Sequence, residues 1–165
     1  MFVLRATRNL LGRLGPVDEP PVPASTTRLG DWYATAWTGR PLIALLVSEA
    51  ALLPVLMPLA PAATLPKRFP DHLAQALRDH EVPTGFIDEE LARMQDVRLA
   101  TTASRSVLGI MNEFTFLAQE AGTRPTLAEL PELARWLART PCSPLYRRHV
   151  SPDRELHALV ATHQS

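Results

Sequence analysis

The chain has 165 residues, 46% of them hydrophobic and 21% charged, and its 17 basic and 17 acidic residues give a net charge of zero. A chain of this length buries roughly 70% of the surface that its unfolded form exposes, so one domain can form a core without disulfides or metals. The balanced charge argues against a disordered chain and against a protein whose main partner is a polyanion such as a nucleic acid. The single cysteine, Cys142, rules out an internal disulfide and favours a cytoplasmic protein.

Neither a secretion signal nor a membrane span is expected. Arg5 interrupts the apolar stretch at the N-terminus, which a secretory signal would keep free of charge. The most apolar segment, residues 41–66, carries Glu49 and is interrupted by internal prolines, whereas a spanning helix needs about 20 consecutive apolar residues. Two buried strands explain this segment better than a membrane helix.

The first half of the chain predicts four strands and one short helix. Residues 2–6 are expected to form an apolar strand, followed by a helix that Thr7 caps and Gly15 ends. Residues 16–30 contain four prolines among polar residues and predict an extended loop. An antiparallel meander of three strands is expected next, over residues 31–38, 42–47 and 52–57. Pro54 restricts the last of these strands to a sheet edge or a bulge.

The second half is mainly helical. Its elements are expected as one strand over residues 97–101 and helices over residues 70–80, 88–94, 105–121, 127–137 and 152–162. Pro70 is expected at the first position of its helix, and Thr126 and Glu129 have the spacing of a capping box. The chain, residues 1–165, therefore predicts a single α+β domain, with a mostly antiparallel sheet of about five strands and covering helices.

The polar side of the longest predicted helix is the most informative feature for function. Arg105, Gly109, Asn112 and Phe116 fall within about 60° of one another on a helical projection, and Glu113 lies beside them. Gly109 costs the helix about 1 kcal/mol relative to alanine, which usually means that something approaches closely there. Two interpretations are open. Another element of the fold packs against Gly109, which is the more common case, or Gly109 forms the floor of a ligand groove.

The junction before this helix has the composition of an anion site. Residues 101–106 read Thr-Thr-Ala-Ser-Arg-Ser, which places hydroxyls, free N–H groups and a guanidinium at a helix start. Capping by Ser104 or Thr102 explains the same pattern without a ligand. The chain has no glycine-rich phosphate loop, so the indication of a nucleotide is weak, and no cofactor is expected.

The candidate acid–base groups are Asp31, Glu49 and Glu113. Each is also typical of a turn or cap carboxylate, and nothing in their spacing pairs them for catalysis. Cys142 lies between two prolines and is expected to be a small buried hydrophobe rather than a nucleophile.

The five histidines show no spacing typical of metal ligands. His149, Asp153 and His157 follow one another at intervals of four residues, yet Pro152 keeps one helix from carrying all three. No metal site is expected.

Four stretches together resemble an uncharacterised family of small bacterial proteins, known as a domain of unknown function. They are residues 4–7, 31–34, 104–113 and 140–145. The third is the most specific and follows the pattern Ser/Asn-Arg-Ser-Val-Leu-Gly-x-Met-Asn-Asp/Glu. The chain departs from the family in having Ala6 in place of Cys and Ser104 in place of Asn. The resemblance implies a compact α+β domain without an established activity. The resemblance also implies six positions that should be tested together: Arg5, Asp31, Trp32, Arg105, Asn112 and Glu113.

Two functions are consistent with the sequence. The preferred one is a cytoplasmic binding or interaction module without catalysis of its own, because no catalytic spacing is present. Its recognition surface would combine Arg105 and Asn112 with Asp31 and Trp32, and its partner would be a protein or a small anionic ligand. The alternative is a small enzyme for a phosphate-bearing or nucleotide-like substrate. There Arg105 and a helix N-terminus hold the anion, and Asp31 or Glu113 is the general base. The candidate ligand-binding residues are Arg5, Asp31, Trp32, Ser104, Arg105 and Asn112.

Overall fold

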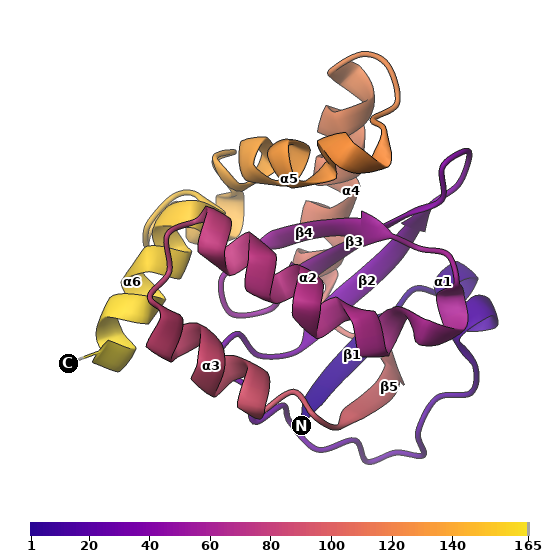
Figure 1. Cartoon of the computed structure of the whole chain (residues 1–165), viewed down its shortest axis with the longest axis horizontal. Coiled ribbons are helices and arrows are strands. Elements are labelled where there is room, and N and C mark those ends of the chain that lie inside the picture. The colour runs from indigo at the N-terminus through magenta and orange to yellow at the C-terminus, as the bar shows by residue number, and fades with distance from the viewer. Residues whose placement is uncertain (165) are drawn as a thin grey trace.

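Five strands form one sheet in the computed structural model, which describes residues 1–164 (Figure 1). They are β1 Phe2–Ala6, β2 Trp32–Trp37, β3 Ile43–Ser48, β4 Pro54–Pro58 and β5 Val97–Thr101. Across the sheet the order is β4-β3-β2-β1-β5. The strands β2, β3 and β4 form the expected antiparallel meander, whereas β1 runs parallel to both of its neighbours, β2 and β5. The sheet is therefore mixed, and the prediction of a mostly antiparallel sheet is wrong.

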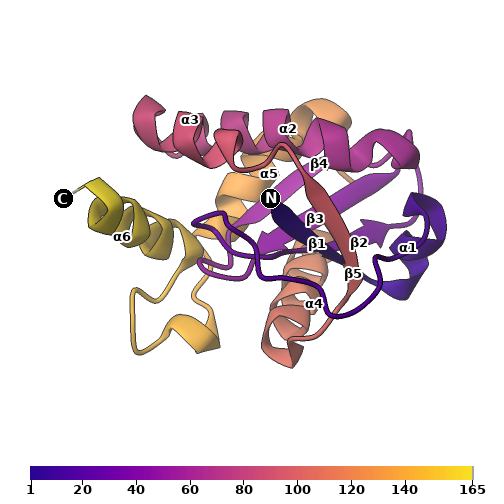
Figure 2. The same cartoon turned by 90° about the horizontal axis from the view of Figure 1, so that it is seen from below.

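Helices cover both faces of this sheet, as Figure 2 shows with α2 and α3 on one face and α4 on the other. The helices are α1 Arg8–Leu14, α2 Leu65–Asp79, α3 Thr84–Ala92, α4 Arg105–Glu120, α5 Leu130–Ala138 and α6 Pro152–Gln164. Alternate strand residues enter two separate cores. The first core, which includes Trp32 and Phe69, lies beneath α1, α2, α3 and α6. The second core, which includes Tyr33 and Phe114, lies beneath α4 and α5.

The parallel half of the sheet follows from the connections between its strands. A hairpin reverses the chain within a few residues, but two parallel neighbours need a crossover of about a dozen residues or more. Helix α1 and the long loop after it connect β1 to β2, while α2 and α3 lie between β4 and β5. Apolar alternation identifies each strand but not its partners, which is why it does not predict the direction of β1 and β5.

The most apolar segment of the chain forms β3 and β4, as expected. Every residue of β3 is buried, because helices cover the sheet on both faces. Pro54 lies in β4, which is an edge strand, as the sequence predicts for a proline that cannot donate to a sheet ladder. Among residues 1–164, no helix has the length and hydrophobicity that crossing a bilayer requires.

Helix α2 begins five residues earlier than predicted. It starts at Leu65 with Pro66 in its first turn, so Pro70 lies inside the helix and not at its first position. The apolar series explains the longer helix: Leu65 and Phe69 are as fully buried as Leu73. These residues recur every four positions and form one continuous apolar side against the first core.

The loop between α1 and β2 passes around the β5 edge of the sheet (Figure 2). Residues 15–31 form neither helix nor strand. The Asp18 backbone N–H donates to the Leu99 carbonyl at 2.9 Å, and the Leu99 N–H donates to the Asp18 carboxylate at 2.6 Å. The loop therefore pairs with the outer side of β5, which would otherwise present unpaired backbone groups to another chain.

Candidate functional site

The strands β1 and β5 end side by side, next to the start of α4. Because they are parallel neighbours, their carboxyl ends share one edge of the sheet. The helix after β1, α1, packs on the first core, whereas the helix after β5, α4, packs on the second. A place where helices leave neighbouring parallel strands toward opposite faces is where open α/β sheets generally bind ligands. This edge is therefore the reference point for the predicted site residues.

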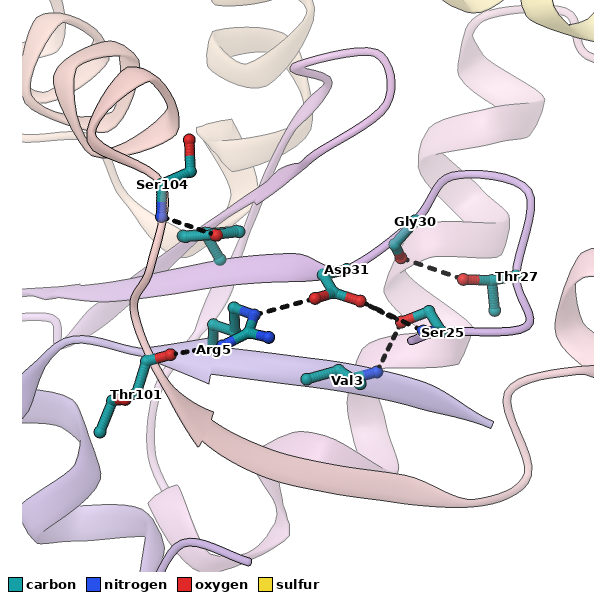
Figure 3. Close-up of polar contacts among 9 residues, drawn as sticks. Val3, Arg5, Ser25, Thr27, Gly30, Asp31, Thr101 and Ser104 are labelled. Atoms are coloured by element: carbon teal, nitrogen blue, oxygen red, sulfur yellow. Dashed lines mark hydrogen bonds and ion pairs between the residues drawn. The ribbon is translucent and has the colours of Figure 1, made fainter. Parts of the chain in front are cut away.

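Arg5 and Asp31 form an ion pair next to this edge (Figure 3). Arg5 Nε donates to Asp31 Oδ2 at 2.8 Å, and Arg5 Nη1 donates to the Thr101 carbonyl at 2.9 Å. The other carboxylate oxygen of Asp31 accepts a hydrogen bond from the Ser25 hydroxyl at 2.7 Å, and that hydroxyl accepts one from the Val3 N–H at 2.8 Å. The Asp31 side chain is 11% exposed. Its carboxylate joins β1, through Arg5, to the long loop.

The start of α4 is held by Ser104 and Tyr33. Ser104 Oγ accepts a hydrogen bond from the Val107 N–H at 3.2 Å. Ser104 therefore caps the helix, as predicted for a junction that needs no ligand. The Ser104 N–H donates to the Tyr33 hydroxyl at 3.0 Å. Sequence reasoning did not single out Tyr33. Strand alternation places Tyr33 on the face opposite to Trp32, and the structure shows that α4 covers the Tyr33 face.

Trp32 lies on the opposite face of the sheet from α4. It is fully buried in the first core, where its ring packs against Phe69 with 4.8 Å between ring centroids. Its indole N–H has no hydrogen-bond partner among residues 1–164. The structure therefore does not bring Trp32 together with Arg105 and Asn112.

Arg105, Gly109, Asn112 and Phe116 form an exposed stripe along α4, named here the α4 stripe. Neither Arg105 nor Asn112 forms a hydrogen bond or ion pair within residues 1–164, and Phe116 is 59% exposed. A methyl group built on Gly109 would meet no atom within 4 Å. The interpretation that another element of the fold packs against Gly109 is therefore wrong.

Replacing Gly109 with alanine is expected to raise the free energy of unfolding by about 1 kcal/mol, because alanine favours a helix interior and the site is open. Urea unfolding followed by circular dichroism measures this change. The matched change Gly122→Ala is expected to destabilise the protein, because Gly122 has a φ of +122°, which alanine adopts only with strain. A loss of stability in Gly109→Ala would contradict an open position.

Glu113 is exposed on α4, and its charge acts on the Cys142 thiol. Burial raises the pKa of the Cys142 thiol to about 12, and the nearby negative charge of Glu113 contributes to the shift. The thiol is therefore protonated at neutral pH, and Cys142 is buried in the second core, as expected for a structural cysteine. Within residues 1–164, no three His, Cys, Asp or Glu side chains are arranged to hold a metal ion.

Sequence reasoning also did not identify Glu90, a fully buried carboxylate on α3. Its two oxygens accept hydrogen bonds from the backbone N–H groups of Arg28 at 2.8 Å and Leu29 at 2.9 Å. Burial raises the pKa of Glu90, and these hydrogen bonds partly offset that effect. The neighbouring Glu89 is exposed, and nothing local in the sequence distinguishes the two residues.

Searches of the curated proteins and of the solved structures give no match to the chain. One family model matches residues 3–155, that of the Domain of unknown function (DUF6933). The match covers nearly the whole sheet and all of the helices up to the start of α6. The resemblance to a domain of unknown function is thereby confirmed, and the chain belongs to this family.

Proposed function

We propose that the protein is a cytoplasmic binding module without catalysis of its own, and that its recognition surface is the α4 stripe. One observation supports this proposal: no role in the fold explains why these residues form the stripe. Arg105 and Asn112 have no partner within residues 1–164, and Phe116 is mostly exposed. Gly109 weakens the helix by about 1 kcal/mol without allowing any close packing inside the chain.

The composition of the stripe supports a protein as the partner. Arginine and aromatic residues are enriched where proteins bind one another, and arginine often contributes strongly to affinity. A bare Gly109 allows another backbone or a side chain to approach the helix closely. The stripe runs along the outside of a helix, whereas sites for small molecules are concave. A protein surface therefore fits it better than a small anion.

The recognition surface proposed here is narrower than the one that the sequence suggests. It keeps Arg105 and Asn112 and adds Phe116. It omits Trp32, which is buried on the other face, and Asp31, whose carboxylate is bound by Arg5 and Ser25.

The alternative, an enzyme for a phosphate-bearing substrate, has one observation in its favour. The N-terminus of α4 and Arg5 lie near the edge where β1 and β5 end. Its candidate bases are placed less favourably. Asp31 is already engaged by Arg5 and Ser25, and Glu113 is exposed on the outside of α4. These positions support the binding module over the enzyme.

Arg105→Ala is expected to change the free energy of unfolding by less than about 0.5 kcal/mol, because the side chain is exposed and without a partner. The same variant is expected to lose binding. Urea unfolding measures the first effect. A large loss of stability would assign Arg105 to the fold and remove it from the recognition surface.

Photocrosslinking in cells of the source organism tests the binding itself. A photoreactive residue at position 112 is expected to give a discrete protein adduct that disappears with Arg105→Ala. The same residue at Asp71, exposed on α2 across the sheet, serves as the control. Adducts that are absent at position 112, or identical at both positions, would overturn the proposal. Stabilisation by nucleotides or inorganic phosphate that depends on Arg105, with no protein adduct, would instead favour the enzyme.

A further inference from the structure

A pocket of about 300 Å³ lies between the end of β2 and the C-terminal end of α4. Three segments line it: the end of β2 with the turn that follows, the last turns of α4, and the stretch just after α4. Its volume is at the lower end of the range for small-molecule sites, about 300–1,000 Å³. The lining residues that matter most are Trp37, Thr38, Thr115, Gln119, Arg124 and Pro125.

Arg124 provides a fixed positive charge in this pocket. Its Nη1 donates to the Thr38 carbonyl at 2.9 Å, and its Nη2 donates to the Trp37 carbonyl at 3.0 Å. Nε and Nη2 also donate to the Pro41 carbonyl, at 3.1 and 2.5 Å. A guanidinium has five N–H donors, so one on Nη1 remains unused. No carboxylate within residues 1–164 forms an ion pair with Arg124, so carbonyls hold the cation in place without neutralising it.

Other residues that line the pocket offer apolar surface and few free hydrogen-bonding groups. The Trp37 indole N–H donates to the Thr115 hydroxyl at 2.8 Å, and that hydroxyl donates to the Met111 carbonyl at 2.8 Å. Both polar groups are therefore already engaged, and Trp37 and Pro125 are the larger apolar residues that line the pocket. Gln119, in contrast, is exposed and forms no hydrogen bond within residues 1–164. Its side-chain amide is available to a ligand.

We propose that this pocket binds a small organic monoanion, a carboxylate carried on a flat apolar body. The single uncompensated charge of Arg124 and the free Gln119 amide match one carboxylate group. Trp37 and Pro125 match the apolar body, and the pocket volume limits it to about the size of a single ring system. The site shares no residue with the α4 stripe, so it stands independently of the proposed binding function.

Titration of the full chain with benzoate, followed by the indole N–H resonance of Trp37 in NMR spectra, tests this site. Benzoate is expected to shift the resonance saturably. Benzamide, which has the same shape without the charge, is expected to bind about tenfold more weakly or worse, and inorganic phosphate is expected to leave the resonance unchanged. No saturable shift with benzoate, or equal binding of benzoate and benzamide, would overturn the proposal. Phosphate binding as strong as that of benzoate would also overturn it.

Two variants locate the binding at the pocket. Arg124→Met is expected to weaken benzoate binding about tenfold, but it also releases the β2–β3 turn. Gln119→Glu avoids that complication, because position 119 is exposed on α4. The negative charge of the new glutamate is expected to weaken benzoate binding several-fold through repulsion. Arg13→Met, which removes an exposed arginine from α1, is the matched control and is expected to leave binding unchanged. Equal affinities in Gln119→Glu and the wild type would contradict the assigned position.

Discussion

Glu90→Ala is expected to lower the free energy of unfolding by about 3 kcal/mol, because it removes the acceptors of two backbone N–H groups, each worth about 1–3 kcal/mol when left unsatisfied. Those donors belong to Arg28 and Leu29, and Leu29 is itself fully buried. The carboxylate on α3 thus holds the end of the long loop just before β2 begins. Urea unfolding measures the global effect, and hydrogen exchange at the Leu29 amide reports the local one.

The neighbouring residue provides a matched control. Glu89 is 58% exposed and forms an ion pair with the Arg28 side chain at 2.6 Å. Exposed ion pairs are worth less than about 1 kcal/mol, so Glu89→Ala should have a much smaller effect than Glu90→Ala. Equal losses of stability in the two variants would contradict the role assigned to the buried carboxylate.

Glu90 is also expected to make the stability depend on pH. Burial raises its pKa above the ordinary value of 4.5, so the native state holds this proton more tightly than the unfolded state. As pH rises from 4.5 through the raised pKa, the unfolded state loses the proton first, and the free energy of unfolding falls. Glu90→Gln lacks this contribution. The stability advantage of the wild type over Glu90→Gln should therefore shrink as pH rises through this window. An advantage that grows with pH would mean that the pKa is lowered in the folded protein.

The presence of the local elements was predictable from the sequence, but the starts of α2 and α3 and the partners of the strands were not. Strand β1 and the start of α4 agree with the prediction, because each is defined by the spacing of nearby apolar residues. The neighbours of β1 depend on segments some 30 and 90 positions away, and local spacing carries no such information. The same limit applies to Glu90: only the approach of the Arg28–Leu29 backbone distinguishes it from Glu89.

Only part of the candidate site could be predicted from the sequence. A helical projection was sufficient to predict that Arg105 and Asn112 share one face of α4, and both are exposed there. Grouping Trp32 with them conflicts with strand geometry, because successive strand residues point to opposite faces. Tyr33, and not Trp32, is the neighbour that reaches the start of α4. The Arg5–Asp31 pair requires the parallel register of β1 and β2, which the sequence did not reveal.

Asp31→Ala is expected to lower the free energy of unfolding by about 2 kcal/mol, because it leaves a partly buried guanidinium without its counter-charge and the Ser25 hydroxyl without its acceptor. The Arg5 side chain is 21% exposed, so water compensates in part, and the effect stays below that of a fully buried pair. A double-mutant cycle with Arg5→Met is expected to give a coupling of about 1–2 kcal/mol. Asp96→Ala, at an exposed ion pair with Arg98, is the control and should cost less than about 0.5 kcal/mol.

The Asp31 variants also test whether Asp31 is a structural residue or a general base. A carboxylate that joins β1 to the long loop cannot be removed without loosening the loop, so limited proteolysis within residues 16–30 should accelerate in Asp31→Ala. A general base would behave differently, because its conservative replacement Asp31→Asn would abolish activity while leaving stability and proteolysis unchanged. An Arg5–Asp31 coupling energy near zero, together with unchanged proteolysis, would contradict a structural role for Asp31. It would then strengthen the enzyme alternative, in which this carboxylate takes a proton from a substrate that Arg105 and the N-terminus of α4 hold.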